Sequence, residues 1–129
     1  MNDYIVWFDQ LSKDDVGIVG GKNASLGEMI SHLSQAGVNV PTGFATTTHA
    51  YCDFLASNGL TMRIKQLLDQ LDVSDINALT TVGKTIRGWL LEASLPDALL
   101  QAVTQAYQQL VADSGDAVSF AVRSSATAE

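Results

Sequence analysis

Residues 19–29 read VGGKNASLGEM, and the predictions for the rest of the chain start from this stretch. Two glycines precede Lys22, and apolar side chains then recur at helical spacing from Leu26 to Leu33, before Gly37 supplies a typical helix stop. Glycine lets a backbone approach a ligand closely, and the first turn of a helix offers N–H groups and a positive dipole end to an anion. The pattern therefore predicts a phosphate-binding turn to which Lys22 adds a full positive charge.

This turn is not the P-loop of many nucleotide-binding proteins. That motif needs glycine at the position of Val16 and Ser or Thr at the position of Asn23. An ordinary turn that carries an exposed lysine explains the same residues equally well. The turn by itself leaves both interpretations open.

The composition is that of a globular chain of single-domain length. The 129 residues are 47% apolar, which is enough for a packed core. A net charge of −7 argues against nucleic-acid and anionic-membrane partners. Cys52 is the only cysteine, so an internal disulfide and a multi-cysteine zinc site are excluded. Because no signal-peptide pattern and no apolar run of ~18 residues occurs, we expect a cytoplasmic protein.

Two of the seven basic residues are isolated from the others. No Lys or Arg lies between Lys22 and Arg63, and none lies between Arg87 and Arg123. Arg123 follows Ala117–Val122, which we predict to be a buried strand. A guanidinium there, followed by small hydroxyl residues, is suited to bidentate contact with phosphate. The alternative is a surface arginine in a C-terminal tail.

The remaining elements are predicted from periodicity and capping residues. We expect an α+β fold, mostly helices with two or three short strands. Apolar stripes on the helices, together with Cys52, Trp89 and Tyr107, are expected to form the core. We predict a strand over Tyr4–Phe8 and a loop or strand over 42–46. One helix is expected to follow a cap at Thr47 or Thr48, and another to cover 60–71. A further helix should follow a cap at Ser74 or Asp75, and the last should begin near Pro96.

Both ends of the chain resemble the amino-terminal part of the phosphoenolpyruvate synthase family, which is related to pyruvate phosphate dikinase. The motifs that carry the resemblance are residues 19–29, VPTGFATT at residues 40–47 and FAVRSSATAE at residues 120–129. Their order and spacing also fit, and the resemblance covers essentially the whole chain.

The resemblance implies that residues 1–129 are the first part of an ATP-grasp-like nucleotide-binding domain, truncated at its C-terminal end. The family makes phosphoenolpyruvate from pyruvate, ATP and water, with release of AMP and phosphate, through a phosphohistidine on another domain. It thereby implies ATP and Mg²⁺ as cofactors, pyruvate as a substrate, the remaining domains of the same enzyme as partners, and a homo-oligomeric parent. The Mg²⁺ ligands, the carrier histidine and the pyruvate site would lie beyond Glu129.

The resemblance also assigns roles to individual residues. In relatives, the residues matching Lys22 and Arg123 contact the ATP phosphates. Neither His32 nor His49 lies in the sequence context of the family's phosphohistidine, so we expect both to be structural or exposed. We therefore expect no catalytic residue and no metal ligand in this chain. The chain alone should show no catalytic turnover. The possible further contacts to phosphate are Gly20, Gly21, Ser124, Ser125 and Thr127.

Three alternatives stay open at this point. The parent enzyme could be a pyruvate phosphate dikinase, which uses ATP together with phosphate. The chain could be a free-standing, non-catalytic nucleotide-binding module. It could also be a purely helical interaction protein, in which case Lys22 and Arg123 should lie far apart and face bulk solvent.

Overall fold

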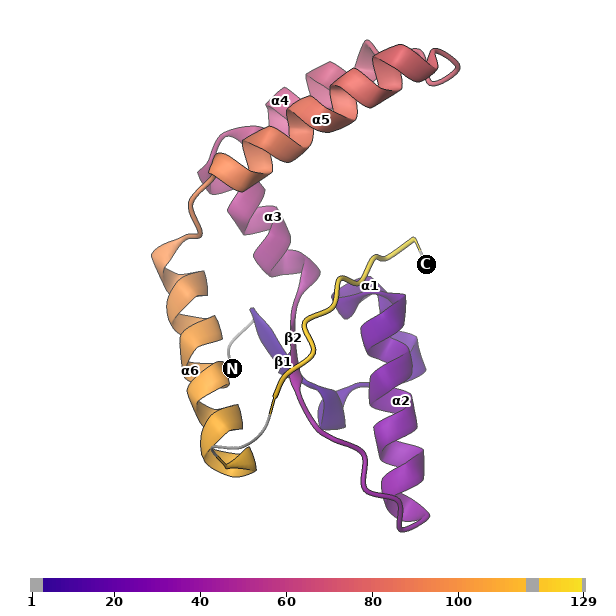
Figure 1. The fold of residues 1–129 in the computed structure, drawn as a ribbon, viewed down its shortest axis with the longest axis vertical. Helices are drawn as coiled ribbons and strands as arrows, with labels where there is room; N and C mark the ends of the chain where they lie inside the picture. Colours follow the sequence, from indigo (N-terminus) through magenta and orange to yellow (C-terminus); the bar gives the residue numbers. More distant parts are fainter. Residues whose placement is uncertain (1–3, 116–118, 129) are drawn as a thin grey trace. The chain divides into compact units, whose positions relative to one another are not determined.

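The structure, a computed structural model, describes residues 4–115 and 119–128, which form two compact units. The first unit is discontinuous in sequence and comprises Met1–Tyr51 and Asp97–Glu129, whereas the second is the segment Cys52–Pro96. Figure 1 shows the described elements, which are β1 (Ile5–Trp7), 3₁₀ turns η1 (Phe8–Gln10) and η2 (Lys13–Asp15), α1 (Val16–Val19), α2 (Gly21–Gln35), β2 (Phe44–Thr46), α3 (Thr48–Ser57), α4 (Leu60–Asp69), α5 (Ile76–Glu92) and α6 (Asp97–Ser114).

The first unit contains a two-stranded antiparallel sheet. β1 pairs with β2, with Val6 opposite Ala45 at the centre of the register. Both extended stretches expected from the sequence are therefore confirmed, although Phe8 already belongs to η1, where its carbonyl accepts the Leu11 N–H at 3.1 Å. The mostly helical α+β class is likewise confirmed.

The glycine-rich stretch forms a junction between two helices. α1 ends at Val19 and α2 begins at Gly21, so the short helix α1 was missed by the sequence analysis and α2 starts just before Lys22. Gly20 connects the two helices with φ of +83°, a conformation that favours glycine. At the other end of α2, Gly37 at φ +81° forms a Schellman stop, in which the Val38 N–H bonds the Leu33 carbonyl at 2.9 Å.

The core of the first unit lies where α1, α2, η1 and the sheet meet. It is formed by the buried side chains of Leu11, Val19, Ala24 and Ala45, against which Val6, Phe8 and Val16 pack. α2 approaches η1 closely at Gly27. A Cβ built there would lie 2.4 Å from the Leu11 Cβ and 2.9 Å from the Phe8 carbonyl oxygen. Only a glycine permits this packing of α2 on η1.

The strand predicted over Ala117–Val122 is wrong for its described part. Residues 119–122 belong to no strand, and the Val122 side chain is 97% exposed rather than buried. The sheet of the described residues consists of β1 and β2 alone, and residues 119–122 are not hydrogen-bonded into it. Ala117 and Val118 lie outside the described residues.

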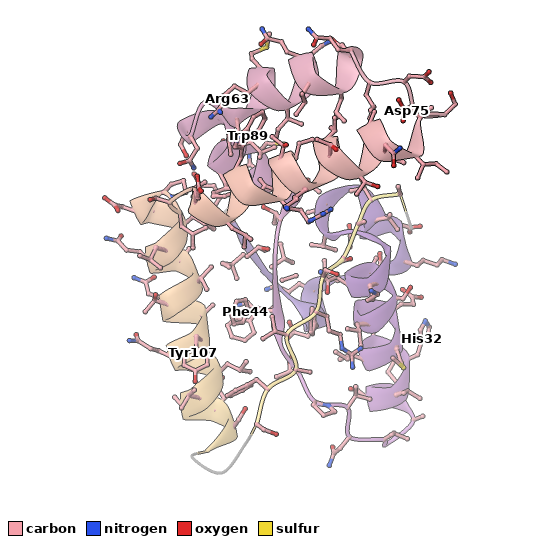
Figure 2. The ribbon with its side chains drawn as sticks, turned by 45° about the horizontal axis from the view of Figure 1, so that its top comes forward. His32, Phe44, Arg63, Asp75, Trp89 and Tyr107 are labelled. Atoms are coloured by element: carbon pink, nitrogen blue, oxygen red, sulfur yellow. The ribbon has the colours of Figure 1, made fainter. Side chains whose placement is uncertain are left out.

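The segment is nevertheless anchored to α6. The rings of Phe120 and Tyr107 meet edge to face, with their centroids 5.5 Å apart, in one of the favoured aromatic geometries. Tyr107 lies on α6, whose buried side chains are Leu99, Ala102, Ala106 and Leu110 (Figure 2).

The second unit is built around the helix pair α4 and α5. The Arg63 guanidinium of α4 lies 4.2 Å from the centre of the Trp89 ring on α5, a cation–π contact (Figure 2). Asn58 receives the Ser94 N–H at 3.3 Å and donates to the Ser94 carbonyl at 2.9 Å, which ties the ends of this unit together. The predicted caps are confirmed at Thr47 for α3 and at Asp75 for α5.

The expectation that all apolar stripes form the core is wrong in part. Ile76 and Leu79 on α5 are 76% and 46% exposed, Tyr107 is 50% exposed and Cys52 is exposed as well. A helix buries only the surface that another element covers. α5 packs mainly on α4, so the rest of its apolar surface faces outward within this unit.

Removing the cap of α5 should destabilise the second unit. Asp75 accepts the Ala78 N–H at 3.1 Å, so Asp75→Ala leaves that donor without its side-chain partner, at a cost of about 1 kcal/mol. Urea unfolding followed by circular dichroism measures the change. Asn77→Ala, an exposed position in the same first turn, is the control. An equal loss of stability in both variants would contradict the capping role.

Candidate phosphate-binding site

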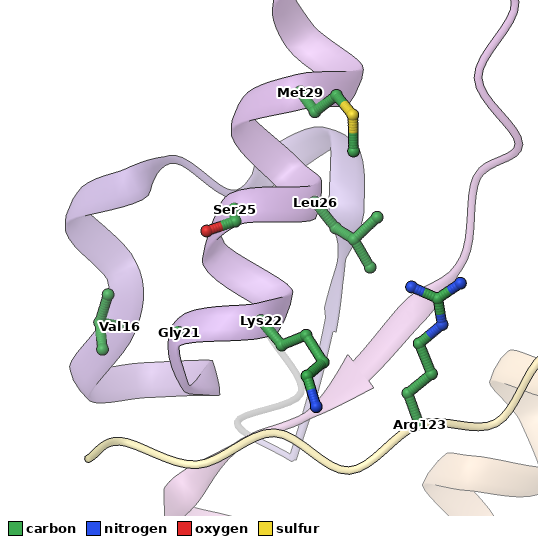
Figure 3. Close-up of a pocket in the computed structure, with 7 residues that line it drawn as sticks. All are labelled: Val16, Gly21, Lys22, Ser25, Leu26, Met29 and Arg123. Carbon is green, nitrogen blue, oxygen red and sulfur yellow. The ribbon is translucent and has the colours of Figure 1, made fainter. Parts of the chain in front are cut away.

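A pocket of about 510 Å³ lies beside the first turns of α2 in the first unit. Its walls come from α1, from one face of α2 and from the C-terminal segment (Figure 3). The residues that line it are Val16, Gly21, Lys22, Ser25, Leu26, Met29 and Arg123.

The pocket brings together the two isolated cations of the sequence. Lys22 stands on the first turn of α2, and Arg123 comes from the extended C-terminal segment. Both side chains are exposed, and their charged ends lie on the same side of α2 (Figure 3). A purely helical interaction protein predicts that Lys22 and Arg123 lie far apart, whereas both line this one pocket.

The remaining wall of the pocket is mostly apolar. Ser25, Leu26 and Met29 follow Lys22 at the i+3, i+4 and i+7 positions and therefore share its face of α2. The spacing of Leu26 and Met29 predicts the apolar face of an amphipathic helix, but Met29 is 44% exposed and lines the pocket. The helical spacing from Lys22 was the signal that could have placed these side chains at the site.

Of the other predicted contacts, only one is among the residues that line the pocket. Gly21 lines the pocket, whereas Gly20, Ser124, Ser125 and Thr127 are not among its lining residues. Gly20 is buried at the helix junction, Ser125 is half-buried, and Ser124 and Thr127 are exposed.

The start of α2 is partly occupied by the protein's own chain. The Gly21 N–H donates to the Ala126 carbonyl at 3.0 Å, and the Asn23 N–H donates to the Ser125 hydroxyl at 3.3 Å. Two donors that the sequence analysis assigned to an anion therefore bind the C-terminal segment instead. No sequence signal paired Ser125 with Asn23, because the two residues are 102 positions apart.

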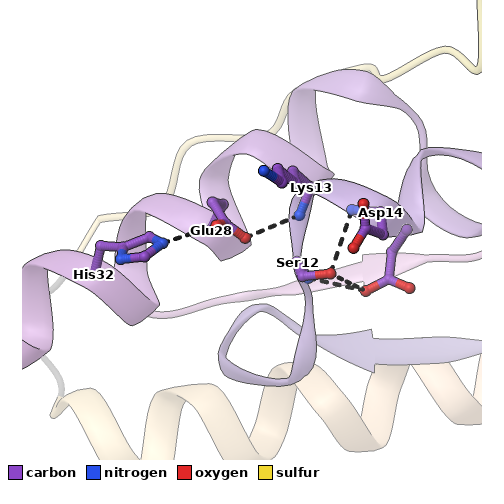
Figure 4. Close-up of polar contacts among 6 residues, drawn as sticks. Ser12, Lys13, Asp14, Glu28 and His32 are labelled. Carbon is purple, nitrogen blue, oxygen red and sulfur yellow. Dashed lines mark hydrogen bonds and ion pairs between the residues drawn. The ribbon is translucent and has the colours of Figure 1, made fainter.

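A polar network on the neighbouring turns of α2 fixes η2 to this helix. One oxygen of the Glu28 carboxylate accepts the Lys13 backbone N–H at 3.0 Å, and the other lies 2.8 Å from the His32 Nε2 (Figure 4). The Lys13 N–H and then the His32 side chain hold the pKa of the Glu28 carboxyl below its usual value. Within η2, Ser12 and Asp15 form a capping box.

This network should make stability depend on pH. Because the folded-state pKa of Glu28 is lowered, its contribution is present above the ordinary glutamate pKa of about 4.3 and is lost as the pH falls through the folded value. Thermal unfolding between about pH 3 and pH 7 should show that Glu28→Gln lowers Tm near neutrality, with the difference from the unaltered protein vanishing in acid. Glu92→Gln, on α5, is the control. A pH-independent difference for Glu28→Gln would contradict the assignment.

Both histidines are exposed, in agreement with the expectation that they are structural or exposed. His32 is exposed in the last turn of α2, and His49 is exposed at the start of α3, where its ring stacks on Tyr4 at 5.5 Å between centroids. In residues 4–115 and 119–128, no group of three or more metal-ligating side chains is assembled. None of the helices among these residues combines the length and apolar character needed to cross a membrane.

Residues 16–129 match the family described as the pyruvate phosphate dikinase AMP/ATP-binding domain. This region includes the glycine junction, Lys22 and Arg123, and it covers most of the chain. The chain therefore belongs to this family of nucleotide-binding domains.

The individual relatives carry a more specific name. The chain is 54% identical over 129 residues to the phosphoenolpyruvate synthase of Neisseria meningitidis serogroup B, 55% over 129 residues to that of Pseudomonas aeruginosa, and 51% over 125 residues to that of Escherichia coli K12. These matches cover 99%, 100% and 97% of this chain, and 16% of the length of each relative. The resemblance seen at both ends of the sequence is thereby confirmed.

Proposed function

We propose that this chain binds the phosphates of ATP through Lys22 and Arg123, as part of a phosphoenolpyruvate synthase. The observation that carries the proposal is that one pocket is lined by both isolated cations. Arg offers a planar fork for phosphate oxygens, and Lys offers a compact positive charge. Membership of an AMP/ATP-binding domain family supports a nucleotide as the ligand that carries those phosphates.

The pocket residues fit the anion better than they fit a metal ion. Apart from Ser25, the side chains that line the pocket bring no oxygen ligand, and none brings a carboxylate, whereas Mg²⁺ prefers carboxylate and phosphate oxygens. The proposal therefore leaves Mg²⁺ to the ATP phosphates and to residues outside this chain. Lys22 and Arg123 would hold and neutralise the phosphates, which is the main protein contribution to phosphoryl transfer.

The wider reaction belongs to the same proposal. Phosphoenolpyruvate would be made from pyruvate, ATP and water, with release of AMP and phosphate, through a phosphohistidine carried by another domain. The relatives at 51–55% identity are named phosphoenolpyruvate synthases, which favours this reaction over that of the dikinase. Other domains of an ATP-grasp-like, cytoplasmic and homo-oligomeric enzyme would cover apolar side chains such as Ile76 and Leu91.

Titration calorimetry with ATP, on this chain and on the full-length protein, tests the proposal. We expect saturable binding by the full-length protein and ATP-dependent phosphorylation of its carrier histidine. The isolated chain should release no AMP from ATP and pyruvate. Full-length protein that binds no ATP would refute the assignment, and AMP release by the isolated chain would show that the chemistry lies within these residues. A full-length protein that binds ATP but phosphorylates no histidine would instead indicate a non-catalytic nucleotide-binding module.

A further inference from the structure

The first turn of α2 obtains its cap from a distant part of the chain. The residue at its own N-cap position is Gly20, which has no side chain to bond the exposed N–H groups. The Ser125 hydroxyl accepts the Asn23 N–H, which is the third N–H of the helix and the usual partner of a capping serine. The Ala126 carbonyl accepts the Gly21 N–H at 3.0 Å.

The absence of a side chain at Gly20 leaves the space that this cap occupies. A Cβ built on Gly20 would lie 2.3 Å from the Ser125 Oγ and 2.8 Å from the Ala126 backbone nitrogen, both far inside van der Waals contact. Its φ of +83° is a second reason why a larger residue is disfavoured. The segment that approaches the buried Gly20 closely is therefore Ser125–Ala126 of the same chain, whereas a ligand was expected there from the sequence.

We propose that Gly20 and Ser125 are positioning residues that dock residues 123–127, here called the C-terminal strap, on the start of α2 and thereby place Arg123 beside Lys22. This inference rests on the proposed function, because it names the residues that assemble the proposed phosphate site. Ser125 acts through Arg123, and Gly20 acts through Ser125.

The geometry of the strap explains why docking controls Arg123. Two residues of extended chain span at most about 7 Å, so fixing Ser125 restricts Arg123 to the neighbourhood of the α2 start. On the other side, Phe120 is held against Tyr107. Between these two anchors, Ala121 and Val122 have no strand partner, and Val122 is 97% exposed. The hydrogen bonds of Ser125 and Ala126 thus order this segment in advance. Without them, the segment would lose conformational entropy when it binds a phosphate.

The role of Ser125 is compatible with phosphate binding. A hydroxyl that accepts the Asn23 N–H can still donate its own proton to an anion. Docking therefore does not compete with the expected contact between this loop and ATP.

The test combines two readouts of docking with one of binding, all in the full-length protein. Ser125→Ala should speed amide hydrogen exchange at Asn23 and tryptic cleavage after Arg123 by about fivefold, the effect of a lost cap worth ~1 kcal/mol. Gly20→Ala should have a larger effect on both. The controls are Ser119→Ala in the same extended segment and Gly17→Ala, where a Cβ would meet nothing within 4 Å. Both controls should leave exchange and cleavage unchanged.

ATP affinity then decides whether docking positions Arg123. Ser125→Ala should weaken ATP binding less once Arg123 is Ala than in the unaltered background, because part of its effect acts through Arg123. Unchanged exchange and cleavage in Ser125→Ala would overturn the inference, and so would additive losses of affinity. If the unaltered protein binds no ATP, the proposed function fails and the placement of Arg123 with it, whereas the docking of the strap is still decided by exchange and cleavage.

Discussion

Arg123→Ala is expected to weaken ATP binding by about 10- to 150-fold, which corresponds to the ~1.5–3 kcal/mol of a hydrogen bond to a charged group. Lys22→Ala should have an effect of similar size, since both side chains line the same pocket. Arg123→Lys should recover only part of the loss, because the charge remains while the bidentate fork is removed. Titration calorimetry gives the affinity, and ATP-dependent phosphorylation of the carrier histidine gives the functional consequence.

Matched charge changes in the second unit control for a general effect of net charge. Arg87→Ala and Lys84→Ala remove the same groups from exposed positions on α5. Both variants should bind ATP like the unaltered protein. Full affinity and full phosphorylation in both Arg123→Ala and Lys22→Ala would refute the roles given to these residues.

Gly27→Ala is expected to destabilise the first unit by about 1–3 kcal/mol, the usual cost of overpacking. The added methyl group would lie 2.4 Å from the Leu11 Cβ and 2.9 Å from the carbonyl oxygens of Leu11 and Phe8. Two of these atoms belong to the backbone, so a change of side-chain rotamer cannot relieve the clash. The separation of α2 and η1 must increase instead.

Urea unfolding measures this effect, with Gly17→Ala as the control in the same unit. A Cβ at Gly17 has open space around it, and alanine is favoured over glycine in a helix, so this variant should be neutral or slightly stabilised. The opposite signs separate the packing effect at Gly27 from the general effect of replacing glycine. Equal stability of Gly27→Ala and the unaltered protein would show that α2 and η1 do not pack as described.

Elements with local signals were predicted well from the sequence. Thr47 and Asp75 bond N–H groups three residues ahead, and Gly37 forms a stop within the same turn, so each signal and its consequence lie close together in the chain. The joint placement of Lys22 and Arg123 was also expected, because both lie in motifs that resemble the same family.

The errors concern features that depend on distant partners. The pattern of residues 119–122 is typical of a strand, but a strand also needs ladder hydrogen bonds to a neighbour, and these residues are not part of the described sheet. Ile76 has the periodicity of a core residue, yet the surface that would cover it is absent from its unit. The bond from Asn23 to Ser125 has no local sequence signature at all, since a serine in that segment is equally suited to contact a phosphate.

The discontinuity of the first unit has a consequence for synthesis on the ribosome. The start of α2 is made early, but the serine that caps it lies 102 residues later, after the whole of Cys52–Pro96. The helix pair of the second unit depends on local contacts and can fold as soon as it emerges. The first unit must wait, with its glycine junction open, until residues 125 and 126 have left the exit tunnel. The second unit can therefore fold before the first, although translation of the first unit begins earlier.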